Sequence, residues 1–351
     1  MEAYQAKDLL NSLQKKIYGF CLDLSRENRK GELSCAFVYA RLDAIRSDAN
    51  DIGELLGVYF SKDPKLAGIF RILLSDINEK CEYYRVKSRE AETSLTPPEF
   101  EDLQYIPETW ISRIERIISY LAPSKTVNIN IIDSKNQQYP LSLTLNEGMG
   151  DAVSRTLRHM PKHVVYRIGE RRLGPRYSRK SLFELDIEPG STIRVESAVG
   201  ELIPNKTFDR PIILRGGQTI NVGGTFIIGR IWGERLGIRM FPRDMYVGQL
   251  MDEIQGDVEK TFSADTRGWI KDKCPRYVSR VHAVIYQKDS VFYFLDVSLN
   301  GTLLISDGEE KDIRSGRDEF NETGQITPYQ LSSNNTVKLF GTSFDIIIKS
   351  Y

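Results

Sequence analysis

VSRVHAVI, residues 278–285, is the central one of three short motifs in the C-terminal part of the chain. FIIGR at residues 226–230 precedes it, and LNGTLLI at residues 299–305 follows it. Around these stretches, short runs of alternating apolar residues are separated by Gly, Asn and Asp, which favour turns. The pattern predicts an all-β sandwich over residues 209–351.

Together the three stretches carry Gly-Arg, then Ser-x-x-His, then Asn-Gly, an order that resembles the signature of the forkhead-associated (FHA) family. The final stretch, VKLFGTSFDIIIKS, is also similar to the closing strand of that family. The resemblance implies a domain that binds phosphothreonine peptides, in which Arg230 and Ser279 contact the phosphate and Arg280 adds a second cation. Asn300 would bond to the backbone of the bound peptide. A guanidinium suits this task because it donates paired, charge-assisted hydrogen bonds to phosphate oxygens.

Three further residues of the motifs are expected to support the site rather than to touch the ligand. His282 is, by residue type, a candidate catalytic base or metal ligand, but the family's histidine braces the binding loops by internal hydrogen bonds. The resemblance therefore favours a structural role for His282. Gly229 and Gly301 are expected to make tight turns where a side chain would interfere.

The sequence departs from the family pattern in two places. The residue before the Asn-Gly asparagine is usually Ser or Thr and adds a phosphate contact, whereas here it is Leu299, preceded by Ser298. In addition, 48 residues separate Arg230 from Ser279, so the sandwich carries an insertion at about 232–272. MYVGQLMDEIQGDVEKTF, within this insertion, has apolar residues at helical spacing. It predicts an inserted helix or lid near the binding face, and both inert decoration and a role in partner choice stay open.

Residues 1–122 are predicted to form an all-α helical bundle. Apolar residues recur at three- and four-residue spacing through four stretches joined by short connections. Asp63-Pro64 is a start signal for the third helix, because Asp can cap and Pro fits the first helical position. Pro97-Pro98 separates the third helix from the fourth. We expect helices through Leu9 to Leu24, over about 33–60, from Pro64 through Tyr84, and through Trp110 to Leu121.

Residues 125–198 change to a two-residue period and resemble the ubiquitin-like β-grasp fold, an α+β class. The order is strand, hairpin, strand, short helix and further strands. SLFELDIEPGSTIRV, with its Pro189-Gly190 turn, is similar to the closing segment of that family. Pro123-Ser124 marks the boundary before this segment, and residues 199–209 are predicted to be a linker. The chain is therefore expected to be a multi-domain protein.

Two local patterns could indicate a more specific function, namely processing like that of ubiquitin or nucleic-acid binding, but we favour neither interpretation. LRGG at residues 214–217 echoes the tail of ubiquitin, but it also fits the first sandwich strand and its turn, so processing is not expected. A basic cluster with interleaved tyrosines resembles a nucleic-acid surface. A solvated loop neutralised by acids of the helical region explains it as well, and we favour that interpretation. The cluster consists of Arg167, Arg171, Arg172, Arg176, Arg179 and Lys180.

The composition limits the remaining function classes. Lys and Arg balance Asp and Glu at 48 each, so no global charge favours nucleic acid, which is an unlikely partner. No apolar run predicts a membrane span, and the N-terminus lacks a secretory core. The four separated cysteines indicate reduced thiols and a cytoplasmic location. His159 and His163 lack further ligands at suitable spacing, and no catalytic signature is present, so neither enzyme activity, metal nor cofactor is expected.

The sequence thus favours a non-catalytic adaptor. Its sandwich would bind a phosphothreonine peptide of a partner in a pathway with a Ser/Thr kinase, while the helical and ubiquitin-like regions dock further proteins. The alternative is a constitutive structural subunit that uses the sandwich independently of phosphate. Leu299 favours this alternative, because it lacks the hydroxyl that usually adds a phosphate contact at this position.

Overall fold

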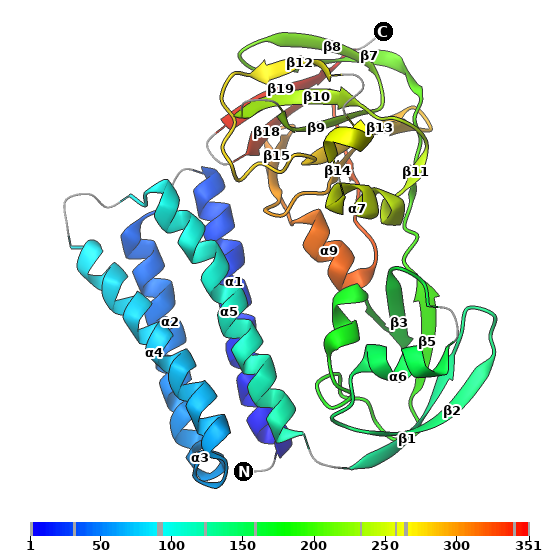
Figure 1. Cartoon of the computed structure of the whole chain (residues 1–351). Helices are drawn as coiled ribbons and strands as arrows, with labels where there is room; N and C mark the ends of the chain where they lie inside the picture. The colour runs from blue at the N-terminus through cyan, green and yellow to red at the C-terminus, as the bar shows by residue number, and fades with distance from the viewer. Residues whose placement is uncertain are drawn as a thin grey trace. The chain divides into compact units, whose positions relative to one another are not determined.

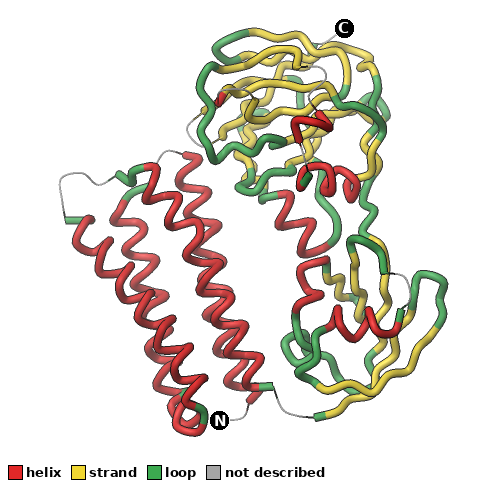
Figure 2. Tube along the Cα trace, viewed as in Figure 1, coloured by secondary structure: helices red, strands yellow, loops and turns green. Residues whose placement is uncertain are grey.

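The computed structural model describes residues 3–30, 33–89, 94–122, 125–157, 160–231, 234–256, 258–262, 266–339 and 342–349. Helices make up the N-terminal region and a β-rich region with several antiparallel sheets follows, as Figure 2 shows by colour. The chain divides into two compact units, residues 1–128 with 142–149 and 180–190, and residues 129–141 with 150–179 and 191–351. The predicted boundary at Pro123-Ser124 lies outside the described residues.

The described part of residues 1–122 forms five helices, and Figure 1 shows their arrangement. The long helix α1 packs against α2 and α5, and α4 packs against the same two helices, so the predicted bundle is present. Its core is apolar and includes Trp110, which is 1% exposed. The helices are α1 (Ala3–Lys30), α2 (Cys35–Leu55), α3 (Gly57–Lys62), α4 (Pro64–Lys87) and α5 (Pro97–Leu121).

Local signals explain where these helices begin and end. The Asp63 carboxylate accepts hydrogen bonds from the backbone N–H of Lys65 and of Leu66, at 2.9 and 3.2 Å, which confirms the predicted start of α4. The helix predicted over about 33–60 is wrong in one respect, because it is interrupted at Leu56. There the backbone N–H bonds to Ile52 and Glu54, and Gly57, a poor helix former, begins the short helix α3.

A five-stranded sheet with one helix follows the bundle. The strand order is β2-β1-β5-β3-β4, with β1 parallel to β5 and β3 antiparallel to both β4 and β5. The predicted strands and helix are present; β4 and η1 were not predicted because their segment is polar and short. The elements are β1 (Thr126–Ile132), β2 (Gln138–Thr144), α6 (Met149–Thr156), β3 (Val164–Ile168), β4 (Arg171–Leu173), η1 (Pro175–Arg179) and β5 (Thr192–Ser197).

Two six-stranded sheets make up most of the C-terminal region. Their orders are β12-β10-β9-β13-β14-β17 and β16-β15-β18-β19-β7-β8. The Phe208 ring of β7 contacts the rings of Phe226 and Phe292 in the other sheet, with centroids 6.2 and 5.0 Å apart, so the sheets face each other. The strands are β7 (Thr207–Arg215), β8 (Thr219–Gly224), β9 (Phe226–Ile231), β10 (Arg235–Met240), β12 (Thr266–Lys271), β13 (Ala283–Lys288), β14 (Val291–Asp296), β15 (Thr302–Ser306), β16 (Glu309–Ile313), β17 (Tyr329–Gln330), β18 (Asn334–Leu339) and β19 (Thr342–Ile348).

The predicted linker 199–209 is partly structured. Its strand β6 (Leu202–Ile203) pairs with β11 (Met245–Tyr246), and its last three residues belong to β7. Ile203 and Met245 are both fully buried, which explains the pairing. The adjacent apolar residues Leu202 and Ile203 within VGELIPNKTFD indicate a short strand, which the prediction of a linker did not take into account.

The insertion predicted at about 232–272 contains the predicted helix, but it also contains strands β10 and β12 of the first sheet. Helices α7 (Val247–Gln255) and α8 (Val258–Phe262) bury apolar residues in one cluster with Ile227, Val284 and Leu295 of the first sheet. The unpredicted helix α9 (Gly316–Thr323) adds Phe320 to the same cluster. The helices therefore cover a sheet face as part of the core, and the expectation of a lid is not needed to explain them.

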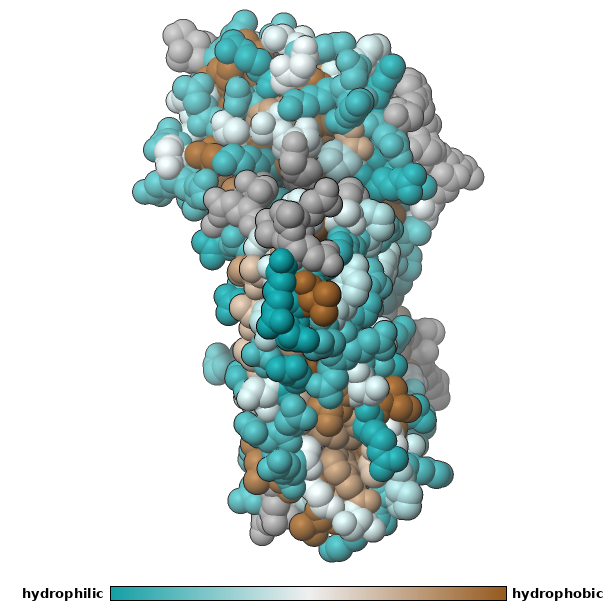
Figure 3. Space-filling view, turned by 90° about the vertical axis from the view of Figure 1, so that its left-hand side faces the viewer, coloured by the Kyte–Doolittle hydropathy of each residue, from teal (hydrophilic) through white to brown (hydrophobic). Residues whose placement is uncertain are grey.

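The part of the chain that the structure describes contains no helix that could span a lipid bilayer. The four cysteines are free, and three of them are buried. On the face drawn in Figure 3, apolar residues lie in small groups among hydrophilic ones.

Candidate functional site

The residues singled out from the three motifs converge at one end of the two facing sheets. The backbone N–H of Arg230, near the end of β9, donates to the Ser279 carbonyl at 3.0 Å, and its Nε donates to Val278 at 3.3 Å. The backbone N–H of Leu299 donates to Ser279 Oγ at 3.2 Å. Asn300 Nδ2 donates to the Tyr277 carbonyl at 2.9 Å. Segments 49 and 20 residues apart in the sequence are thus held in direct contact.

Gly229 allows this convergence, because the Ser279 loop lies directly on its backbone. A Cβ atom at position 229 would lie 2.1 Å from the Arg280 carbonyl oxygen and 3.0 Å from that of Ser279. Gly301 has φ +71°, and a Cβ there would lie 2.4 Å from the Ile313 carbonyl oxygen. Both positions therefore require glycine for close approach, and Gly301 requires it for its backbone conformation too. The turn expected at Gly229 is wrong, because Gly229 lies inside strand β9.

His282 is fully buried and joins the two loops through hydrogen bonds. Its Nδ1 accepts from the Ser279 backbone N–H at 3.3 Å, so the ring proton must lie on Nε2. Nε2 then donates to Thr302 Oγ1 at 3.0 Å, and that hydroxyl donates to Asp296 Oδ2 at 2.5 Å. With both ring nitrogens occupied inside the protein, His282 has the geometry of a brace and not that of a catalytic base.

Asp296 is the anchor of the Asn-Gly loop and was missed at the sequence level. It is 1% exposed, and its Oδ1 accepts from the Ser298 N–H, the Ser298 hydroxyl and the Gly316 N–H at 2.8, 2.8 and 3.1 Å. A lone acid closing the apolar strand VFYFLD was the available signal. A buried carboxylate is stable only with such partners, so the loop geometry depends on it.

Ser298 does not replace the hydroxyl that Leu299 lacks. Its hydroxyl donates to Asp296 and accepts the backbone N–H of Asn300 and of Gly301, at 3.3 and 2.8 Å. This uses its hydrogen and both lone pairs inside the loop. Leu299 itself is 57% exposed.

The site offers hydrogen-bond donors and positive charge. Ser279 Oγ accepts from Leu299, and its hydrogen is not taken up by any residue in the described ranges. Arg280 is exposed and forms no ion pair within those ranges. Arg230 is half-buried, and its only hydrogen bond from the guanidinium to a described residue uses Nε, leaving its outer nitrogens for another acceptor. Such a set suits an anion with several oxygens.

Cys274 lies near Arg230 but is not a reactive thiol. Burial raises the pKa of the Cys274 thiol to about 12, although the positive charge of Arg230 acts in the opposite direction. The thiol is therefore protonated at neutral pH, and a thiolate is the nucleophilic form of cysteine. Among the described residues, no group of three or more His, Cys, Asp and Glu could hold a metal ion.

The basic cluster and the other histidines have bonds elsewhere. Arg176 pairs with Glu322 at 2.6 Å and Lys180 with Glu115 at 2.5 Å, so acids neutralise part of the cluster. Only Glu115 belongs to the helical region, which corrects the expectation that all these acids lie there. His163 Nε2 lies 2.6 Å from Asp252, and His159 is outside the described residues.

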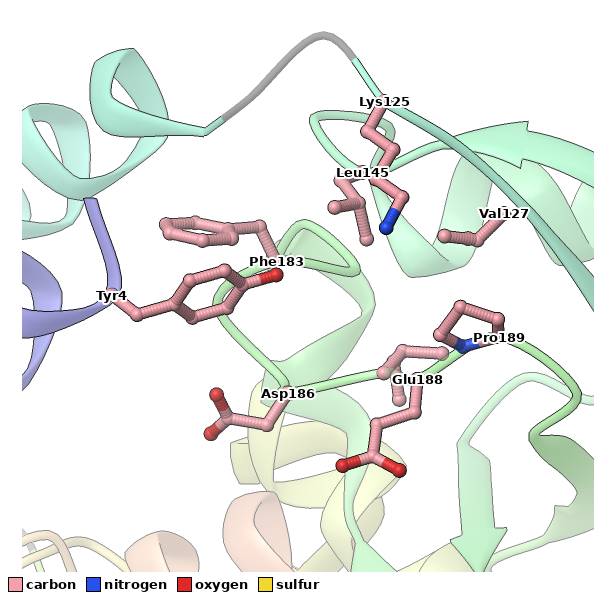
Figure 4. Close-up of a pocket in the computed structure, with 9 residues that line it drawn as sticks. Tyr4, Lys125, Val127, Leu145, Phe183, Asp186, Glu188 and Pro189 are labelled. Carbon is pink, nitrogen blue, oxygen red and sulfur yellow. The ribbon is translucent and has the colours of Figure 1, made fainter. Parts of the chain in front are cut away.

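One pocket, of about 260 Å³, lies within the first compact unit (Figure 4). Val127, Leu145 and Ile187 give it apolar walls, while Lys125 and Glu188 carry charge at its lining. Asp186 also lines it and is paired with Lys7, whose ammonium is buried and donates to the Phe183 carbonyl at 2.5 Å. This ion pair joins helix α1 to the segment that precedes β5.

Comparison with known proteins does not assign the chain to a family. No family model matches the chain, and no curated protein matches it.

Proposed function

We propose that the chain is a non-catalytic adaptor whose C-terminal region, residues 209–351, is an FHA domain that binds a phosphothreonine peptide of a partner protein. One observation carries this proposal: hydrogen bonds hold together the three separate segments that carry Arg230, Ser279 and Asn300. Arg280 follows Ser279, and its carbonyl lies against Gly229. Ser279 has a hydroxyl hydrogen and Arg230 has outer guanidinium nitrogens for phosphate oxygens.

The rest of the chain is assigned by the same proposal. Residues 1–122 form a helical domain and residues 125–198 a ubiquitin-like β-grasp domain, the latter supported by the hairpin, the single helix and the parallel pairing of β1 with β5. Both would dock further proteins. A Ser/Thr kinase would switch the assembly by phosphorylating the partner, and a cytoplasmic location belongs to this proposal.

A phosphothreonine peptide library probed with the full-length protein tests the proposal. Arg230→Ala should cost about 2–5 kcal/mol of binding, because it removes one partner of a charge pair. Ser279→Ala should weaken the same peptides, and the unphosphorylated library should not bind. Arg243→Ala is the matched control: Arg243 is exposed, pairs with Glu253 and follows β10 at the end away from Arg230.

If the two site variants bind selected peptides as well as the wild type and the Arg243 variant do, the proposed function is wrong.

Leu299 favours a second candidate, a constitutive structural subunit that binds its partner without phosphate. A hydroxyl is absent at this position and Ser298 does not supply one. Phosphatase treatment of a purified complex discriminates the two: an adaptor releases its partner, and a structural subunit keeps it.

A further inference from the structure

The backbone of Leu299 lies beside the hydroxyl of Ser279, and its apolar side chain is exposed. Its backbone N–H donates to Ser279 Oγ at 3.2 Å, which fixes the backbone of Leu299 next to the donor that we assign to the phosphate. Its side chain is 57% exposed, whereas Ser298 before it is fully buried. The residue bonded through its backbone to Ser279 therefore offers a ligand an exposed apolar side chain and no polar side-chain group.

The loop that presents Leu299 is held in place before any ligand arrives. Ser315 Oγ donates to the Ser298 carbonyl at 2.8 Å, and the Arg317 backbone N–H donates to the same oxygen at 3.3 Å. Asp296 binds the loop from beneath, as described above. Since a preorganised contact costs little ordering on binding, even one apolar side chain here can contribute to selectivity.

We infer that Leu299 is a specificity-determining residue, and that the site takes phosphorylated segments with an apolar side chain close to the phosphorylated residue. This inference rests on the proposed function. A partner's apolar side chain laid against Leu299 removes both from water. Each methylene group buried in this way strengthens binding about fourfold. We therefore expect a preference of roughly 4- to 10-fold for an apolar over a polar neighbour.

The test uses synthetic phosphothreonine peptides that differ at one position. At each of the three positions on either side of the phosphothreonine, a Leu peptide is compared with a Ser peptide by fluorescence anisotropy on the full chain. The wild type should prefer Leu at one or more positions. In Leu299→Thr and Leu299→Ser the Leu-to-Ser affinity ratio should fall to about one, and binding of the Ser peptides should rise because a hydroxyl donor is added.

Leu22→Thr is the matched control, because Leu22 is 52% exposed on α1, outside the site. It should keep the wild-type ratio. A ratio of one in the wild type, or an unchanged ratio in Leu299→Thr, would overturn the inference while leaving phosphate binding intact. If wild-type protein binds none of the phosphorylated peptides, the proposed function itself fails, and the inference with it.

Discussion

Replacing Gly229 with Ala should push the Ser279 loop away from β9 and weaken both the fold and the binding site. The new Cβ would lie 2.1 Å from the Arg280 carbonyl oxygen, whereas ordinary contact begins at 3.4 Å. The two backbones must therefore part by about 1.3 Å. The hydrogen bond from Arg230 N–H to the Ser279 carbonyl, now 3.0 Å, does not survive such a shift.

The magnitude follows from what is lost. One or two hydrogen bonds are worth about 1 kcal/mol each, and forcing an extra methyl group into a packed site costs about 1–3 kcal/mol. Together they give about 2–5 kcal/mol. In a region of this size that lowers the melting temperature by roughly 5–15 °C. Phosphopeptide affinity should fall as well, because Arg230 and Ser279 no longer face the same oxygens.

Differential scanning calorimetry of the full chain and a peptide titration measure both effects. Gly223→Ala is the control, since a Cβ on Gly223 in β8 meets no atom within 4 Å. That variant should melt within about 1 °C of the wild type and bind normally, as expected where Ala fits without strain. If Gly229→Ala behaves like Gly223→Ala, the loop does not lie on β9 as described.

Three further predictions concern other parts of the chain. Asp296→Ala should destabilise the C-terminal region by about 3–5 kcal/mol, because its buried donors lose their acceptor; calorimetry and amide exchange of the 298–301 loop measure this. Burial acts to raise the pKa of Glu99, but hydrogen bonds from Lys87, Tyr83 and Thr96 lower it to about 2. The stabilisation by Glu99 is therefore complete above its ordinary pKa of 4.5 and is lost as pH falls toward 2. Acid titration of helicity should show a flatter loss in Glu99→Gln than in the wild type. Trp110→Ala should cost about 3–5 kcal/mol in urea unfolding, since it empties the bundle core.

Much of the fold could be predicted from local sequence. The three- and four-residue spacing of apolar residues predicted the helices of the bundle, and the Asp63-Pro64 pair predicted the start of α4. The alternation around Val127 and Ile131 gave strand β1. Short polar elements such as α9 were not predicted. In α9 only Phe320 is a buried large apolar residue, so the local sequence has no helical apolar pattern. The helix is stabilised by packing of Phe320 against residues that are distant in the sequence.

The candidate site was less accessible to sequence reasoning. The motifs give the positions of Arg230, Ser279 and Asn300, but not the bonds that bring them together. Asp296 and Thr302 were missed because their role depends on contacts between distant segments. Likewise, only the structure shows that the Ser298 hydroxyl is hydrogen-bonded within its own loop and is therefore not available to a ligand.

Whether the C-terminal region recognises phosphothreonine is measured by calorimetric titration of the full-length protein with a library-selected phosphothreonine peptide and with its unphosphorylated copy. The phosphorylated peptide should bind at least 100-fold tighter, as two or more charge-assisted hydrogen bonds to phosphate would give. Arg230→Ala should remove most of this difference, while Arg243→Ala should leave it unchanged. Equal affinity for the two peptides, or a difference that Arg230→Ala does not alter, would show that the site does not bind phosphate as proposed.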